Sequence, residues 1–242
     1  MAVDTVGLPL YRRIALDLRE RIAGGELAPG SQVETEPELM ARYGVSRATV
    51  RQALGSLIAA NLLEIRRGLG TFVRARPMEH ALGGFYTFSR EIERHGMVPG
   101  TRVLDVRVEP ADERVAAALI IAPGESVVAL ARIRLADDEP LVTETSYLPA
   151  ARFPGLELVD FDSVRLYETL TTRYGTRPVR AREMFEPVLL SRAEALLLHR
   201  EPGDPALRVE RTAYDADETI VEYCRSTVRG DRYRYSVELR EP

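Results

Sequence analysis

Apolar residues recur at helical spacing over the first sixty residues, and they alternate with polar ones over the following fifteen. The first stripe, with members four residues apart, consists of Leu10, Ile14, Leu18 and Ile22. The second, at i, i+3, i+4, i+7 and i+8, consists of Val50, Ala53, Leu54, Leu57 and Ile58. Residues 62–66 and 71–73 alternate around a turn that contains two glycines, which predicts a β-hairpin.

Start and stop signals place two further helix boundaries between these stripes. Thr35-Glu36-Pro37-Glu38 has the spacing of a capping box, with a proline tolerated in the first helical turn. Gly44 suits the left-handed C-terminal cap of that helix, and Ser46 is placed to cap the next one, predicted over residues 47–61. Two helices joined by so short a glycine-containing turn predict a helix-turn-helix.

The start of the second of these helices is basic and polar, as a DNA-reading helix requires. Arg47 and Arg51 lie one turn apart, and an arginine can donate two hydrogen bonds to guanine. Ser46 and Thr49 are suited to hold phosphate, and Arg67 is expected at the hairpin tip, as in a DNA-contacting wing. The alternative is a small helical subdomain with solvated arginines, but the order of cap, turn, stripe, basic end and wing favours DNA binding.

Composition narrows the class of protein. The chain has 242 residues, of which 45% are hydrophobic, with no run long enough to span a bilayer, so we expect a soluble, cytoplasmic protein. A single cysteine, Cys224, excludes an internal disulfide, and three scattered histidines show no ligand spacing, so no metal, cofactor or catalytic set is expected. Residues 1–76 contain 11 arginines against 8 acidic residues, and the remainder contains 22 against 29.

The C-terminal part contains an internal repeat at an offset of 79 residues. Its matching pairs are His95-Gly96 with Tyr174-Gly175, Pro99 with Pro178, Pro123-Gly124 with Pro202-Gly203, Arg132 with Arg211, and Asp138-Glu139 with Asp217-Glu218. Each copy predicts the order helix, strand, helix, hairpin, and therefore an α+β domain with pseudo-twofold symmetry. The predicted organisation is a DNA-binding domain over residues 7–74, a linker over 75–84 and a second domain over 85–242.

Two arginines of the first hairpin stand out as a candidate site. Arg132 and Arg134 are two residues apart on a strand, so they share a face at a spacing of about 7 Å. Such a pair is costly unless it meets a carboxylate or an anion. Glu144 is the candidate partner: a three-residue turn puts it beside Arg134, whereas a two-residue turn puts it on the other face. The sequence leaves open an internal salt bridge, a solvated face and an anion site.

Several motifs resemble GntR-family transcriptional regulators. In the head these are Pro9-Leu10-Tyr11, Gly25-Glu26-Leu27, Pro29-Gly30-Ser31, residues 43–54 and Gly68-x-Gly70-Thr71-Phe72-Val73. The second half is similar to the UTRA effector-binding domain of the HutC subfamily through Phe88-Ser89, Arg132-x-Arg134, residues 144–149, Tyr167-Glu168 and residues 229–233. The resemblance implies a winged helix-turn-helix followed by a chorismate-lyase-like domain with a mixed, mostly antiparallel sheet, which dimerises and binds a small metabolite.

The resemblance also implies site residues. The DNA-binding set is Ser46, Arg47, Thr49, Arg51, Gln52, Arg67, Gly68, Gly70 and Thr71. The effector-binding set is Phe88, Ser89, Arg132, Arg134, Glu144, Arg165, Tyr167, Glu222 and Tyr233. Three positions depart from the family pattern: Arg165 replaces a serine of members that bind amino-sugar phosphates, Val228 replaces an aromatic residue, and Pro37 replaces an arginine that reaches DNA.

These observations predict a homodimeric repressor of double-stranded operator DNA that is released by a small anionic metabolite. The anion is expected because Arg132, Arg134 and Arg165 face one conspicuous carboxylate, Glu144. Two alternatives remain open at this point. One is an enzyme resembling chorismate lyase, although no convergent acid–base set is visible. The other is a constitutive DNA-binding protein whose pocket is collapsed by Arg165.

Overall fold

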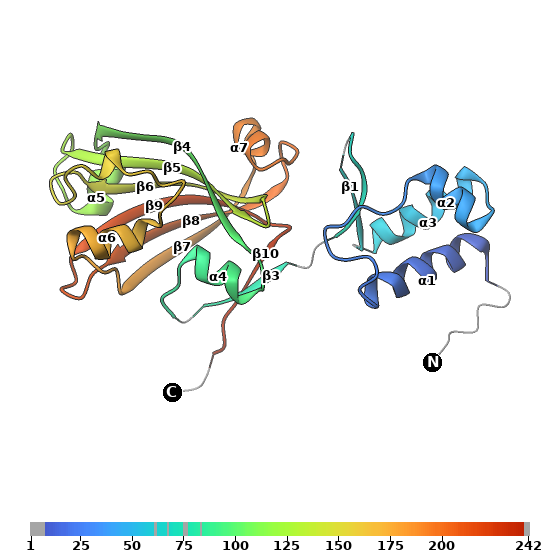
Figure 1. Cartoon of the computed structure of the whole chain (residues 1–242). Coiled ribbons are helices and arrows are strands. Elements are labelled where there is room, and N and C mark those ends of the chain that lie inside the picture. Colours follow the sequence, from blue (N-terminus) through green and yellow to red (C-terminus); the bar gives the residue numbers. More distant parts are fainter. Residues whose placement is uncertain (1–7, 61, 67, 75–76, 83, 240–242) are drawn as a thin grey trace. The chain divides into compact units, whose positions relative to one another are not determined.

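The computed structural model describes residues 8–239 apart from 61, 67, 75–76 and 83, and it divides the chain into two compact units, Met1–Arg76 and Pro77–Pro242 (Figure 1). The first unit contains α1 (Leu10–Ala23), α2 (Glu36–Tyr43), α3 (Arg47–Ala59), β1 (Leu63–Arg66) and β2 (Gly70–Val73). Among the helices described in either unit, none is long and apolar enough to cross a bilayer.

The predicted winged helix-turn-helix is confirmed. The two apolar stripes meet in one core, whose most deeply buried members include Leu18, Leu39, Val50 and Leu57. The Glu38 carboxylate accepts the Thr35 backbone N–H at 2.7 Å, which caps α2, and Gly44 ends that helix with φ 63°. Strands β1 and β2 pair antiparallel as the wing hairpin. The expected tip residue, Arg67, lies outside the described residues.

The second unit is built around a six-stranded antiparallel sheet. Its helices are α4 (Phe88–Arg94), α5 (Glu113–Leu119), η1 (Leu156–Leu158, a 3₁₀ turn), α6 (Leu166–Tyr174) and α7 (Arg192–Leu197). Its strands are β3 (Met78–Ala81), β4 (Pro99–Pro110), β5 (Ser126–Ala136), β6 (Glu139–Pro149), β7 (Arg180–Leu189), β8 (Pro205–Tyr214), β9 (Ile220–Arg229) and β10 (Tyr233–Ser236). The sheet order β4-β5-β6-β9-β8-β7 is symmetric about the β6–β9 pair.

The 79-residue repeat is therefore visible in the structure. Both copies have the order helix, strand, helix, hairpin, and the two hairpins β5–β6 and β8–β9 meet at the centre of the sheet. Helices α4 and α6 cover one face, where Val128 and Leu130 pack against α6 and Val142 and Val228 pack against α4 (Figure 1). Helices α5 and α7 cover the opposite face. The first face carries the cavity described below.

The expected linker over residues 75–84 is too long. Residues 78–81 form β3, which pairs parallel with β10, and the side chains of Met78 and His80 are buried. The sequence Met78-Glu79-His80-Ala81 is too short and too polar to give a strand signal. Its partner strand lies at the other end of the domain, so only the folded chain reveals the pairing.

Because β3 belongs to the second unit, we expect a fragment of residues 77–242 to fold and a fragment of residues 82–242 to be less stable. Loss of the buried Met78 side chain alone removes about 2 kcal/mol, and the β3–β10 hydrogen bonds are lost as well. Urea unfolding of both fragments measures the difference. As a control, removing residues 237–242, where Val237 and Leu239 are exposed, should leave stability unchanged. Equal stability of fragments 77–242 and 82–242 would contradict the expectation.

Candidate functional site

The exposed start of α3 presents the predicted DNA-reading side chains together. Ser46 caps α3 by accepting the Thr49 backbone N–H at 3.3 Å, and the two hydroxyl groups lie 2.9 Å apart. The Arg47 and Arg51 side chains are 62% and 71% exposed, and Gln52 is exposed beside them. All five side chains are therefore accessible to a ligand as large as a duplex.

The wing hairpin is held by Gln32, a residue without a recognisable motif in the sequence. The Gln32 side chain donates to the Leu69 carbonyl at 2.9 Å, and Gln32 also forms a β-bridge with Phe72. Gly68 and Gly70 have φ values of 76° and 122°, and a Cβ on Gly70 would come within 2.6 Å of the Gln32 amide. Gly70 therefore allows the close approach of Gln32, whereas Gly68 allows the left-handed backbone of the turn, and Thr71 follows on β2.

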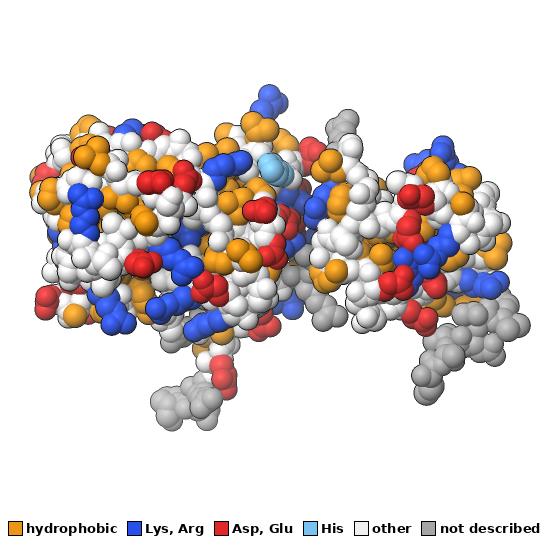
Figure 2. All heavy atoms as spheres, viewed as in Figure 1, with side chains coloured by type: hydrophobic (Ala, Val, Ile, Leu, Met, Phe, Trp, Pro, Cys, Tyr) orange, Lys and Arg blue, Asp and Glu red, His pale blue; other side chains and the backbone are white. Residues whose placement is uncertain are grey.

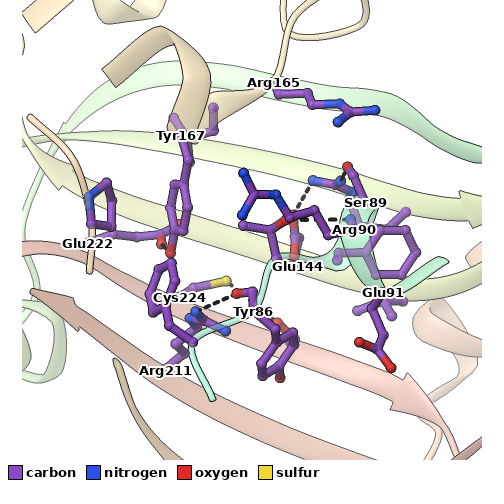
Figure 3. Close-up of a pocket in the computed structure, with 18 of the residues that line it drawn as sticks. Tyr86, Ser89, Arg90, Glu91, Glu144, Arg165, Tyr167, Arg211, Glu222 and Cys224 are labelled. Atoms are coloured by element: carbon purple, nitrogen blue, oxygen red, sulfur yellow. Dashed lines mark hydrogen bonds and ion pairs between the residues drawn. The ribbon is translucent and has the colours of Figure 1, made fainter. Parts of the chain in front are cut away.

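A cavity of about 690 Å³ opens on the sheet face between α4 and α6 (Figure 3). All nine side chains expected at an effector site line it, so the fold brings together residues from six separate segments. Phe88 lies under the Arg134 guanidinium, whose carbon is 4.8 Å from the ring centroid, and Tyr233 stacks with Tyr235 at 6.0 Å. Val228, the replaced aromatic position, is a buried part of the wall.

The centre of the cavity wall holds two buried arginines against one carboxylate. The Glu144 Oε1 atom lies 2.6 Å from Arg132 Nη2 and 3.3 Å from Arg134 Nη1. Arg134 also donates to the Ser89 hydroxyl at 3.0 Å, and Arg132 donates to Ser146 at 3.2 Å. The Nε atoms of both arginines are buried without a hydrogen-bond partner. This group therefore carries one positive charge in excess.

A β-bulge brings Glu144 to the arginines. Ala136 pairs with Glu139, so the hairpin has a two-residue turn, which by itself places Glu144 on the opposite face. The register shifts because Leu135 pairs with Pro140 and Arg134 with Val142, leaving Leu141 as the extra residue. Glu144 consequently pairs with Arg132. No residue pattern in the sequence signals this bulge, so turn length alone does not predict which face Glu144 occupies.

Electrostatics keep Glu144 ionised. Burial alone would raise the pKa of Glu144, but the charges of Arg132 and Arg134 outweigh it and hold that pKa below its ordinary value. Burial, together with the neighbouring Arg132 charge, lowers the pKa of Arg134, and Glu144 opposes that shift. Burial also raises the pKa of the Cys224 thiol in the same wall, so this cysteine is a neutral, inert group.

The other end of the cavity offers an acceptor. The Tyr167 hydroxyl donates to the buried Glu222 carboxylate at 2.5 Å, and the Phe85 ring stacks over Tyr167 at 6.0 Å. Figure 3 shows Tyr167 and Glu222 on the side of the cavity opposite Ser89. The cavity is thus polar at both ends, with donors at one end and a carboxylate at the other.

Arg211 is a cavity residue that sequence reasoning missed, although it was matched to Arg132 in the repeat. It pairs with Glu183 at 3.0 Å and donates to the Tyr86 carbonyl at 2.8 Å. The Tyr86 hydroxyl donates to the same Glu183 carboxylate at 2.7 Å. Arg211 therefore fastens the chain segment before α4 to the sheet, and its charge is already compensated.

Arg165 lines the cavity at its rim, where it already has a partner. Its guanidinium lies 2.6 Å from Glu93 on α4, and its side chain is 53% exposed. Figure 3 shows its side chain above Ser89 in the view. Because Glu93 compensates the charge of Arg165, the excess charge at the centre of the wall comes from Arg132 and Arg134, and the cavity stays open beside Arg165. Figure 2 shows acidic and basic side chains interspersed on the visible face of each unit, as in the pair of Arg165 and Glu93.

The chain matches two family models. The model described as bacterial regulatory proteins, gntR family, matches residues 10–73, and the UTRA domain model matches residues 94–234. The chain is 36% identical over 229 residues to the HTH-type transcriptional repressor NagR of Bacillus subtilis (strain 168), which covers 94% of this chain and 93% of NagR. It is 30% identical to the mannosyl-D-glycerate transport/metabolism system repressor MngR of Escherichia coli (strain K12), with 95% of each chain covered.

A solved structure shares the whole architecture. PhnF from Mycobacterium smegmatis superposes with a TM-score of 0.66 at 28% sequence identity, covering 95% of this chain and 100% of PhnF. The effector domain of PhnF gives a TM-score of 0.62 over 67% of this chain.

We expect Glu144→Gln to lower the free energy of unfolding by about 3–5 kcal/mol, because it leaves two buried guanidinium groups without a counter-charge. The folded-state pKa of Glu144 is depressed, so its stabilising contribution is present above the ordinary carboxyl range and is lost as pH falls through the folded-state value. Urea unfolding at neutral and acidic pH measures both effects. Glu168→Gln, an exposed residue of the same cavity, is the control, and similar losses for both variants would count against the prediction.

Proposed function

This chain belongs to the GntR family of bacterial regulatory proteins, in the HutC subfamily with a UTRA domain, and from that membership we propose how it is controlled. Members are transcription regulators, so the chain is a ligand-responsive DNA-binding repressor and not an enzyme. Our proposal is that a small anionic metabolite occupies the cavity of the second unit and thereby releases the head from operator DNA.

The observation that carries the proposal is the excess charge at Arg132, Arg134 and Glu144. A buried positive charge without a partner is unfavourable, and two Nε–H groups there lack acceptors. A phosphate, sulfate or carboxylate supplies both the charge and the acceptors, and Arg134 and Ser89 are the groups we assign to hold it. Both side chains line the cavity and are already bonded to each other.

The other end of the cavity supports a ligand with hydroxyl or ammonium groups. Glu222 and Tyr167 accept and donate hydrogen bonds there, and a polyhydroxylated molecule satisfies both. Two relatives carry sugar derivatives in their names, mannosyl-D-glycerate and fructoselysine. We therefore infer an anionic, sugar-derived effector. Val228 leaves this site without the aromatic residue of amino-sugar-phosphate binders, so the effector differs from a plain amino-sugar phosphate.

The DNA-binding assignments rest on α3 and the wing. We assign base reading to Arg47 and Arg51, with Gln52 beside them, and phosphate contacts to Ser46, Thr49, Gly68, Gly70 and Thr71. Arg67 belongs to the same proposal. The exposure of the two arginines supports the assignment.

Control by the effector follows from what lines the cavity. His80 and residues 85–91 belong to the stretch of chain that directly follows the DNA-binding unit, and they form one wall. A ligand that binds Ser89 therefore acts on α4 and on the segment before it. It shifts the protein toward a state with low operator affinity if it binds that state better. We propose that this state separates the two heads of a homodimer from adjacent half-sites.

An anionic ligand should stabilise the full-length chain, whereas its neutral counterpart should not. We expect at least one of glucose 6-phosphate, 6-phosphogluconate and gluconate to raise the thermal midpoint and to release DNA. At 100 times its dissociation constant, such a ligand raises the free energy of unfolding by about 2.7 kcal/mol. Glucose is the matched neutral ligand, and Arg134→Gln should abolish the effect while Glu168→Gln retains it. A neutral ligand that binds more tightly than every anion, and releases DNA, would show that the arginines serve an internal role.

We expect the full-length chain and the fragment 77–242 each to be dimers at micromolar concentration. The second unit has its own core and sheet, and dimerisation through it is what the family resemblance implies. Light scattering coupled to size-exclusion chromatography measures the mass. A monomeric mass for the fragment would place dimerisation elsewhere, and a monomeric full-length chain would overturn the proposed homodimer.

A further inference from the structure

We propose that Glu36 is a positioning residue for DNA recognition, which holds both base-reading arginines in register from a neighbouring helix. Glu36 is the first residue of α2, and its carboxylate lies between Arg47 and Arg51 of α3. The two ion pairs use different oxygen atoms: Oε2 is 3.3 Å from Arg47 Nε, and Oε1 is 3.5 Å from Arg51 Nε. One carboxylate therefore serves two guanidinium groups.

The nitrogen atom that faces Glu36 determines which arginine donors remain available for DNA. Both arginines face Glu36 through Nε, so the two terminal Nη groups of each remain available. The bidentate contact with guanine O6 and N7 requires two donors held in one plane. Both contacts are ion pairs and not hydrogen bonds, so the carboxylate attracts the Nε side of each guanidinium by charge and leaves its outer donors for the base.

The exposure of the three side chains fits positioning better than stabilisation. Arg47 and Arg51 are 62% and 71% exposed, and Glu36 is 35% exposed, so these ion pairs contribute little to folding in water. Docking on a duplex removes that water, and the same pairs then act in a drier environment. The two ion pairs are therefore stronger in the complex with DNA than in the free protein.

The backbone restricts where the carboxylate can go. Pro37 lies in the first turn of α2, where its ring fixes its own φ near the helical value. The α2 N-terminus is further held by the bond from Thr35 N–H to Glu38 at 2.7 Å. Glu36 is thus presented from a capped, rigid turn. Pro37 itself offers no donor to DNA, so we assign to this turn the role of orienting the α3 arginines.

A carboxylate beside DNA has a predictable signature. It repels phosphate, so it weakens sequence-independent binding, while its hold on the arginines strengthens discrimination between bases. Removing the charge should therefore move the two properties in opposite directions. A helix that is merely destabilised weakens both together.

The test compares full-length wild type with Glu36→Gln in selection from a randomised duplex library, followed by anisotropy titrations of the selected and scrambled duplexes. We expect the ratio of selected to scrambled affinity to fall about tenfold in E36Q, with scrambled affinity unchanged or higher. Glu36→Asp, which keeps the charge on a shorter side chain, should lose less. Circular dichroism verifies that each variant is folded.

Two controls decide between mechanisms. Glu26→Gln removes an exposed charge of the same unit that pairs with Arg21, and it should keep the wild-type ratio. In the Arg47→Ala, Arg51→Ala background, E36Q should cause no further loss, because its effect passes through those arginines. An unchanged ratio in E36Q overturns the proposal. An equal fall of this ratio when E36Q is added to the double-arginine variant also overturns it. A new base preference in E36Q overturns it as well, because Glu36 would then read cytosine directly.

Discussion

The second unit is organised by the need to accommodate two buried guanidinium groups with one carboxylate. Arg132 and Arg134 project from the same face of β5, and burial makes an unpaired charge there expensive. Glu144 meets them only because the bulge at Leu141 shifts the register of β6. The surplus charge lies in the wall of the polar cavity that opens between the helices on that face.

The internal repeat explains why the two ends of that cavity differ. Arg132 and Arg211 occupy matching positions on the two hairpins, yet their surroundings give them different roles. Arg211 is neutralised by Glu183 and donates to the Tyr86 carbonyl, so it holds the segment before α4 against the sheet. Arg132 shares its carboxylate with a second arginine, so one positive charge there has no counter-charge. One backbone plan thus yields a structural end and an end with excess positive charge, through different residues around an equivalent arginine.

Local signals in the sequence were enough for the head and for the element order of the second unit. Glu38 caps α2 from three residues away and Gly44 ends it, so the determinants of α2 lie within its own segment. The contacts that define the site are distant in sequence. Glu93 meets Arg165 across 72 residues, and Glu183 meets Tyr86 across 97, so no local pattern reports them. The Leu141 bulge and β3 were missed for the same reason: each depends on a partner strand.

The two sites share one arrangement, a carboxylate between two arginines, and burial decides what it does. Around Glu144 the arginine side chains are 5% and 11% exposed, so the shared carboxylate is firmly held and one charge stays unbalanced away from water. Around Glu36 the arginines are mostly exposed, so water screens the pairs and the outer nitrogen atoms stay free. We propose that the buried arrangement creates affinity for a small anion. The exposed one has little energy of its own, and it acts by fixing the direction in which two arginines meet a much larger polyanion.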